Sequence, residues 1–178
     1  PEQVRRTRRR FAYGIVESNR GMESPVLFGS RESGVPLANA VAEEMSAVSN
    51  GTVRARALNV TPFRDDRPGL DPPATPPHNL DVADRNVILI DDVIFTGRTA
   101  RAAFDAVLQY GRPRSIQLVV LIDRGHREYP IQPDCTGRRL QTKREERVVV
   151  QGDEEFAVSV QRGDASSAPP QSTRSDVS

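Results

Sequence analysis

The chain has little of the chemistry that disulfides, metal clusters or membrane spans require. Cys135 is the only cysteine among 178 residues, so no intrachain disulfide can form. Two histidines, His78 and His126, are too few for a zinc site of their own. No apolar run approaches the roughly 20 residues that span a bilayer, and none follows the arginine-rich first residues as a secretory signal would require. These absences predict a cytoplasmic protein in a reducing environment, with no membrane partner.

Length and composition indicate one globular domain. A chain of 178 residues, 37% hydrophobic and 28% charged, is long enough to bury a substantial core. From Gly163 onward it is rich in serine and proline and has no apolar anchor. We therefore predict a folded domain over 1–162 and a disordered tail over 163–178.

The most informative motif is V-I-L-I-D-D-V-I-F-T-G-R-T at 87–99. Its first four residues predict a buried strand of a parallel sheet. Asp91 and Asp92 follow at the carboxyl end, where open α/β sheets bind their ligands. The turn at 96–99 begins a helix, and the free N–H groups there favour phosphate. Paired carboxylates and a phosphate turn suit a phosphorylated ribose. The alternative is that the two aspartates only end a strand and cap a helix.

Predicted strands and helices alternate along the chain, which is typical of a doubly wound parallel sheet. The helices are expected over 3–20, 35–48 and 98–110. The strands are expected over 26–28, 53–60, 87–90, 116–122, 147–151 and 155–160. Residues 123–146 are predicted to be irregular. Residues 64–84 contain five prolines and few apolar residues, which is typical of a lid loop.

Basic residues gather in two places although the net charge is only +1. Residues 5–10 hold five arginines, and residues 138–147 hold four arginines and one lysine. Such local patches suit nucleic acid on a near-neutral protein. The alternative is that each is an ordinary solvated face of a helix or loop.

Three segments together resemble one family: the 87–99 motif, Y-G-R-P at 110–113 and D-R-G-H-R-E-Y-P-I at 123–131. They resemble the bifunctional pyrimidine operon regulators and uracil phosphoribosyltransferases, over roughly residues 3–160. The resemblance implies the α/β type I phosphoribosyltransferase fold, a central mostly parallel sheet flanked by helices, with a mobile lid loop and a small hood.

The resemblance also implies an activity and partners. Members transfer the phosphoribosyl group of phosphoribosyl diphosphate (PRPP) to uracil, which yields UMP and pyrophosphate. Mg²⁺ arrives on PRPP, with no direct metal ligand from the protein. The UMP-bound form binds the leader of pyrimidine biosynthetic mRNA, and members form homodimers or homotetramers.

The resemblance assigns roles to individual residues. Asp91 and Asp92 would hold the ribose hydroxyls, and Arg64 of F-R-D-D would contact substrate phosphates; these three are the predicted catalytic residues. The rest of the predicted PRPP and nucleotide site is Val93, Ile94, Phe95, Thr96, Gly97, Arg98, Thr99, Arg31, Glu32 and Ser33. The predicted base pocket contains Asp123, Arg124 and His126, with much of the uracil recognition from backbone groups. The predicted RNA-binding residues are Arg9, Arg10, Arg138, Thr142 and Arg144.

Two positions leave alternatives open. Glu32-Ser33 stands where the family has Thr-Arg, and losing one charge-assisted contact costs about 1.5–3 kcal/mol. One alternative is that Arg31 replaces the missing cation. Otherwise the chain is a UMP-sensing RNA regulator with weak or lost turnover, and a third alternative is transfer to another base. His126 is either a general base or, as we prefer, a residue that holds its loop by hydrogen bonds.

Overall fold

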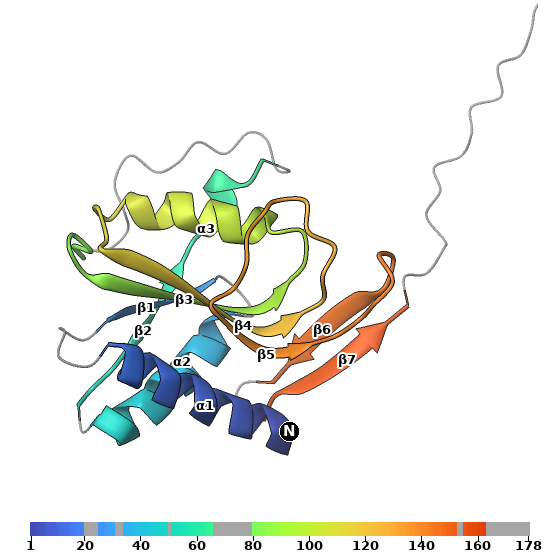
Figure 1. Ribbon diagram of the computed structural model, residues 1–178, viewed down its shortest axis with the longest axis horizontal. Coiled ribbons are helices and arrows are strands. Elements are labelled where there is room, and N and C mark those ends of the chain that lie inside the picture. Colours follow the sequence, from blue (N-terminus) through green and yellow to red (C-terminus); the bar gives the residue numbers. More distant parts are fainter. Residues whose placement is uncertain (20–24, 31–33, 50, 66–79, 153–154, 163–178) are drawn as a thin grey trace, which may run out of the picture.

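The computed structural model describes residues 1–19, 25–30, 34–49, 51–65, 80–152 and 155–162 (Figure 1). Its elements in chain order are α1 (Glu2–Ser18), β1 (Val26–Ser30), α2 (Gly34–Ser49), β2 (Ala55–Leu58), the 3-10 turn η1 (Thr61–Phe63), β3 (Asn86–Ile94), α3 (Arg98–Leu108), β4 (Ser115–Asp123), β5 (Cys135–Arg139), β6 (Arg147–Gln151) and β7 (Ala157–Gln161).

Five parallel strands form the central sheet in the order β2-β1-β3-β4-β5. Helices α1 and α2 cover one face, and α3 covers the other (Figure 1). This is the α/β architecture that the sequence predicts. Strand β3 lies at the centre, between β1 and β4.

The apolar run at 87–90 is buried from both faces, as a central parallel strand requires. Ile88 and Ile90 pack in the core under α1 and α2, whereas Val87 and Leu89 pack in the core under α3. All four side chains are at most 3% exposed. The run is therefore continuous rather than alternating because neither face of the strand meets water.

Strands β6 and β7 form a separate antiparallel pair beside the β5 edge of the main sheet (Figure 1). Val148 and Phe156 are buried against the α1–α2 core, and the guanidinium of Arg8 lies 5.6 Å from the Phe156 ring. The first predicted strand is confirmed as Arg147–Gln151, and the second begins two residues later than predicted. This pair matches the small hood that the family resemblance implies.

The prediction that 123–146 is irregular was wrong over Cys135–Arg139, which form β5. The segment C-T-G-R-R has no apolar pattern, so pairing with β4 rather than local preference makes it a strand. Gly137 permits the close approach, because a Cβ there would lie 2.4 Å from the Leu121 carbonyl oxygen.

Other boundaries differ by a few residues. Strand β2 is shorter than the predicted 53–60, and β3 extends through both aspartates because its backbone continues to pair with β4 as far as Ile94. Helix α3 ends at Leu108, two residues early.

Parts of three predictions lie outside the described residues. These are most of the lid, the pyrophosphate-loop residues Arg31, Glu32 and Ser33, and the tail over 163–178. Within the described ranges, none of the helices is both long and apolar enough to cross a bilayer.

Candidate functional site

The two adjacent carboxylates lie near the carboxyl end of β3 and are oriented by neighbours. The Asp91 Oδ1 accepts a short hydrogen bond from the Ser30 hydroxyl at the end of β1, and another from the Asp92 N–H at 3.1 Å. The Asp92 Oδ1 accepts from the Val93 N–H at 2.8 Å. Two strands therefore fix the pair at the edge where a ligand would bind.

Burial raises the pKa of Asp91 to about 7, and the negative charge of Asp92 adds to the rise. The hydrogen bond from Ser30 opposes it, because a donor stabilises the ionised form. Asp91 therefore changes protonation near neutral pH. A pair of carboxylates this close suits a ligand with neighbouring hydroxyls that donate to both.

The turn at 96–99 has the backbone of a phosphate site. Gly97 precedes α3 with φ of 90°, a left-handed conformation that favours glycine. The first helical hydrogen bond runs from the Arg101 N–H to the Gly97 oxygen, so the N–H groups before it have no partner within the helix. That of Arg98 makes a long hydrogen bond of 3.4 Å to the Thr96 hydroxyl. Arg64 donates to the Thr99 hydroxyl at 3.1 Å. The structure therefore brings the predicted Arg64 to this turn.

The guanidinium of Arg98 is engaged by carboxylates. It pairs with Asp65 at 2.7 Å and with Glu128 at 2.8 Å, and it lies 5.2 Å from the centre of the Tyr129 ring. The Tyr129 hydroxyl also donates to Asp65 at 2.6 Å. The Arg98 side chain thus holds Asp65 and the loop at 128–129. The group of this residue that remains for a phosphate is its backbone N–H, which would give up the 3.4 Å bond to the Thr96 hydroxyl.

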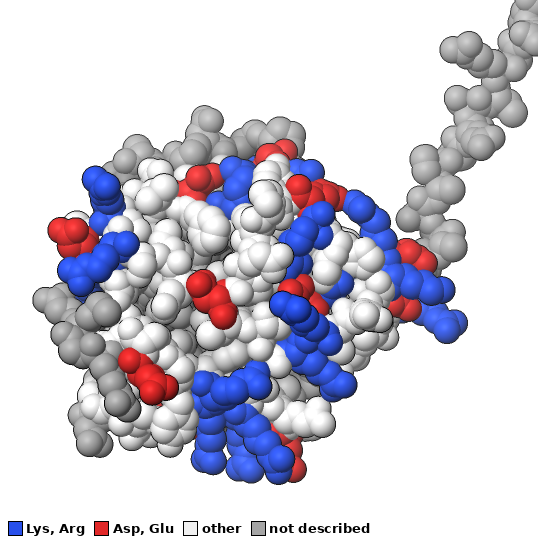
Figure 2. All heavy atoms as spheres, viewed as in Figure 1, with Lys and Arg blue, Asp and Glu red and all other residues white. Residues whose placement is uncertain are grey.

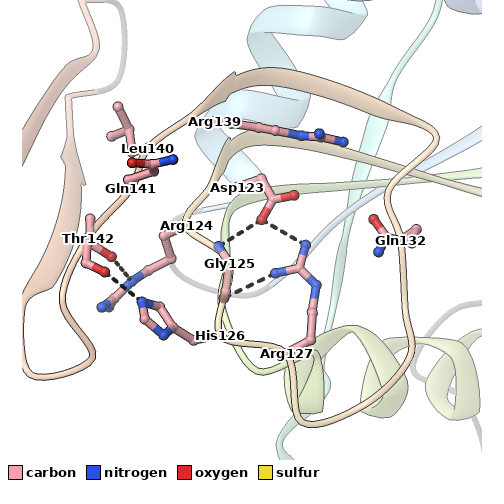
Figure 3. A pocket seen from close by; sticks show the side chains of 10 residues that line it. All are labelled: Asp123, Arg124, Gly125, His126, Arg127, Gln132, Arg139, Leu140, Gln141 and Thr142. Atoms are coloured by element: carbon pink, nitrogen blue, oxygen red, sulfur yellow. Dashed lines mark hydrogen bonds and ion pairs between the residues drawn. The ribbon is translucent and has the colours of Figure 1, made fainter.

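A pocket of about 510 Å³ lies at the carboxyl ends of β4 and β5 (Figure 3). Asp123 at its floor pairs with Arg127 at 2.8 Å and accepts from the Gly125 N–H at 3.0 Å. All three predicted base-pocket residues line it. Thr142, predicted for RNA, also lines it. Six further lining residues were not predicted: Gly125, Arg127, Gln132, Arg139, Leu140 and Gln141.

Arg124 and His126 join this pocket to the segment after β5. Arg124 donates to the Thr142 hydroxyl at 3.1 Å and to the Lys143 oxygen at 2.8 Å, and its guanidinium lies 4.1 Å from the centre of the Phe95 ring. Burial lowers the pKa of Arg124. The His126 Nε2 lies 2.7 Å from the Thr142 oxygen. A carbonyl only accepts, so this nitrogen carries a proton, which favours the loop-holding role of His126.

Comparisons with known proteins agree with this geometry. The family described as "Phosphoribosyl transferase domain" matches residues 2–153. The protein named "Bifunctional protein PyrR" from Trichormus variabilis is 48% identical over 151 residues, 84% of each chain. The one from Bacillus subtilis is 40% identical over 158 residues, 86% of this chain and 87% of that one.

The chain belongs to the PyrR family of phosphoribosyltransferases. Solved structures extend the match in fold. A hypoxanthine phosphoribosyltransferase from Staphylococcus aureus superposes with a TM-score of 0.63 at 14% identity, covering 80% of this chain and 76% of that one. A purine phosphoribosyltransferase from Pyrococcus horikoshii gives 0.58 at 21% identity, covering 78% and 84%. The predicted type I phosphoribosyltransferase fold is confirmed.

The RNA-binding residues predicted from the PyrR resemblance have different surroundings. Arg10 donates to the carbonyl oxygens of Thr136 and Gly137 on β5, at 3.1 and 3.0 Å. Arg9 pairs with Glu44 of α2 at 3.4 Å and remains 60% exposed. Arg138 is exposed. Figure 2 shows basic side chains over α1 and, separately, towards the β6–β7 pair.

Sequence reasoning also missed three residues around the aspartate pair and the phosphate turn. Ser30 holds Asp91, whereas Glu128 and Tyr129 hold Arg98. One sequence signal could have indicated Ser30, because it comes just after the predicted strand at 26–28, and strand ends in such sheets meet at the ligand-binding edge. The other two stand in the 123–131 segment, and only the fold shows which residues of that segment face the phosphate turn.

Proposed function

We propose that this chain transfers the phosphoribosyl group of PRPP to uracil, and that its UMP-bound homo-oligomer binds the leader of pyrimidine biosynthetic mRNA. The observation that carries the proposal is the Asp91–Asp92 pair on β3, next to the 96–99 turn. PyrR proteins at 40–48% identity, such as those of Bacillus subtilis and Trichormus variabilis, support both roles.

The reaction needs stabilisation of positive charge as the anomeric carbon loses pyrophosphate. In the proposed complex, Asp91 and Asp92 accept the two ribose hydroxyls and place negative charge below the ring. The N–H groups of the 96–99 turn hold the 5′-phosphate. Arg64, bonded to Thr99, is placed to meet a substrate phosphate. Together these groups fix the sugar while uracil approaches from the side of the 510 Å³ pocket.

Mg²⁺ bound to PRPP would neutralise charge on the departing pyrophosphate. Among the described residues, no three His, Cys, Asp or Glu side chains gather to cage a metal ion. An ion held largely by substrate phosphates and water needs no such cage, so the residues present fit a Mg²⁺ that enters with its substrate.

The base pocket suits a small imide. Uracil presents alternating N–H and C=O groups, and the loop after β4 offers backbone groups at its edge. Arg127 neutralises the Asp123 carboxylate at the pocket floor, so a neutral base meets no unpaired negative charge from it. Arg124 and Arg139 also line the pocket and make it net positive.

Pyrophosphate release from PRPP and Mg²⁺ tests the transferase, with uracil compared against hypoxanthine, guanine and orotate. Release that depends on uracil supports the proposal, and Asp92→Asn should abolish most of it. Asp105→Asn is the matched control and should keep most of the activity, because it removes a partly exposed carboxylate on α3 that pairs only with Arg101 among the ion pairs of the described residues. Release with a purine or with orotate instead of uracil would contradict the proposed substrate.

The second candidate is a UMP-sensing RNA regulator without turnover, and Glu32-Ser33 motivates it. It predicts tight UMP binding and no pyrophosphate release with any base. The double substitution Glu32→Thr with Ser33→Arg should then raise release, because it returns a cation to the pyrophosphate loop. An unchanged rate would count against this explanation.

A further inference from the structure

One carboxylate joins the nucleotide site to the basic segment, defined as residues 138–147. The Glu128 Oε2 accepts from the Nε of Arg98 at 2.8 Å, and the Glu128 Oε1 accepts from Arg144. Arg98 belongs to the phosphate turn, and Arg144 belongs to the basic segment. The Arg144 side chain is 65% exposed and that of Glu128 only 28%. Arg144 is thus held from one side and open to an outside partner on the other.

Backbone hydrogen bonds reinforce this connection. The N–H groups of Glu128 and Tyr129 both donate to the Thr96 oxygen, at 2.8 and 3.0 Å. On the opposite side of the same loop, His126 and Arg124 hold Thr142. The loop over 124–129 is therefore attached to the phosphate turn and to the basic segment at once.

We propose that Glu128 couples nucleotide occupancy of the phosphate turn to the ordering of the basic segment, so that the segment binds RNA more tightly when UMP is present. The inference rests on the proposed function and adds a positioning residue to it. A phosphate that fixes the turn also fixes Arg98 and the Thr96 oxygen, and through them Glu128 and Arg144. A partner that meets an already ordered segment loses less conformational entropy on binding. Such coupling acts equally in both directions.

A bound nucleotide can also order the basic segment by touching it directly, without Glu128. The pocket is lined by residues 139–142, so a bound base can order that part of the segment by contact alone. Residues 143–147 lie beyond the pocket lining, and their backbone includes the Lys143 N–H bonded to Glu146 at 2.8 Å and the Glu146 N–H bonded to the Lys143 oxygen at 3.2 Å. Exchange of these amides with solvent reports the order of the segment beyond the pocket lining. Arg124 of the pocket also donates to the Lys143 and Arg144 oxygens, so a variant of Glu128 is needed to separate the two routes.

Glu128→Gln is the diagnostic variant. Glutamine keeps the size and one accepting oxygen, but it loses the charge and turns an NH₂ donor towards one of the two guanidinium groups. Glu145→Gln is the matched control, because Glu145 is an exposed carboxylate of the same basic segment. Both variants change the net charge equally, so a general charge effect would appear in both.

Hydrogen exchange followed by mass spectrometry, on the full chain with and without saturating UMP, tests the coupling. Peptides over 92–99 report nucleotide occupancy, and peptides over 143–147 report the basic segment. In the unmodified protein we expect UMP to slow exchange in both windows, by about threefold or more in the second. Glu128→Gln should keep the first effect and lose the second, and Glu145→Gln should keep both.

The outcomes separate the two proposals. If UMP slows exchange over 143–147 equally in Glu128→Gln and in the unmodified protein, Glu128 is not the coupling residue. If UMP slows exchange over 92–99 but not over 143–147 in the unmodified protein, the coupling is absent and only this inference fails. If UMP has no effect over 92–99, the nucleotide site itself is refuted, and the proposed function fails with it.

Discussion

Replacing Asp91 by asparagine should stabilise the fold at mildly alkaline pH. The pKa of this carboxyl rises from 3.8 to about 7 because of burial and the charge of Asp92. Between these values the folded state binds a proton that the unfolded chain has released, so stability falls as pH rises. An asparagine side chain does not ionise, and its oxygen still accepts from Ser30 and from the Asp92 N–H.

The size of the effect follows from the shift. A rise of about three pKa units corresponds to a ceiling of about 4 kcal/mol, at about 1.4 kcal/mol per unit. Asp91 keeps part of its surface in water, so we expect about half of that ceiling, about 2 kcal/mol, at about pH 8. Below about pH 4 both forms of the protein are neutral at this position, and the difference should vanish.

Urea unfolding followed by circular dichroism, at about pH 4, 6 and 8, measures this difference. Asp105→Asn is the control, because it removes a partly exposed carboxylate of α3. Asp105 pairs with Arg101 one helical turn away, and losing such a pair should shift stability by no more than about 0.5 kcal/mol at each pH. A destabilised Asp91→Asn at about pH 8, or a gain that does not depend on pH, would refute the reasoning.

Three further predictions concern two glycines of the fold and one hydrogen bond beside the phosphate turn. Gly137→Ala should destabilise the fold by about 1–3 kcal/mol in urea unfolding, because its Cβ would lie 2.4 Å from the Leu121 oxygen; a neutral result would mean that β5 can shift. Gly14→Ala, where nothing lies within 4 Å of the added Cβ, should instead stabilise α1 by about 0.5–1 kcal/mol, and a loss in the same assay would contradict this. Tyr129→Phe should raise the pKa of Asp65 towards its usual value, because the Tyr129 hydrogen bond is the main cause that lowers it; carboxylate titration by NMR measures this, and an unchanged pKa would show that Arg98 alone is sufficient.

The centre of the fold could be predicted from the sequence because short local patterns determine its structure. The apolar run at 87–90, the two aspartates and the turn around Gly97 each have one structural solution, and all three agree. The predicted strand and helix types on either side are therefore confirmed, with shifts of a few residues at their ends.

The rest depended on contacts between distant segments. Strand β5 exists because Cys135–Arg139 pair with β4, and no local pattern of C-T-G-R-R predicts that. Likewise, Glu128 contacts both Arg98 and Arg144, which lie 30 and 16 residues from it in the chain. Its role in joining the two segments therefore depends on how the chain packs. Single-sequence patterns describe faces and turns, whereas a residue held between two elements becomes visible only after they pack.

The two hydrogen bonds from Arg10 to β5 have a consequence for solubility. Strand β5 is the outer strand of the sheet, and an open strand edge is a template on which another chain can add a strand and begin to aggregate. The Arg10 guanidinium donates to the carbonyl oxygens of Thr136 and Gly137. Adjacent carbonyls of a strand point to opposite sides, and it is the Gly137 oxygen that faces away from β4. The strand continues into the exposed charges of Arg138 and Arg139. Arg10 of α1 thus makes the outer strand β5 a poorer template for a strand of a neighbouring molecule.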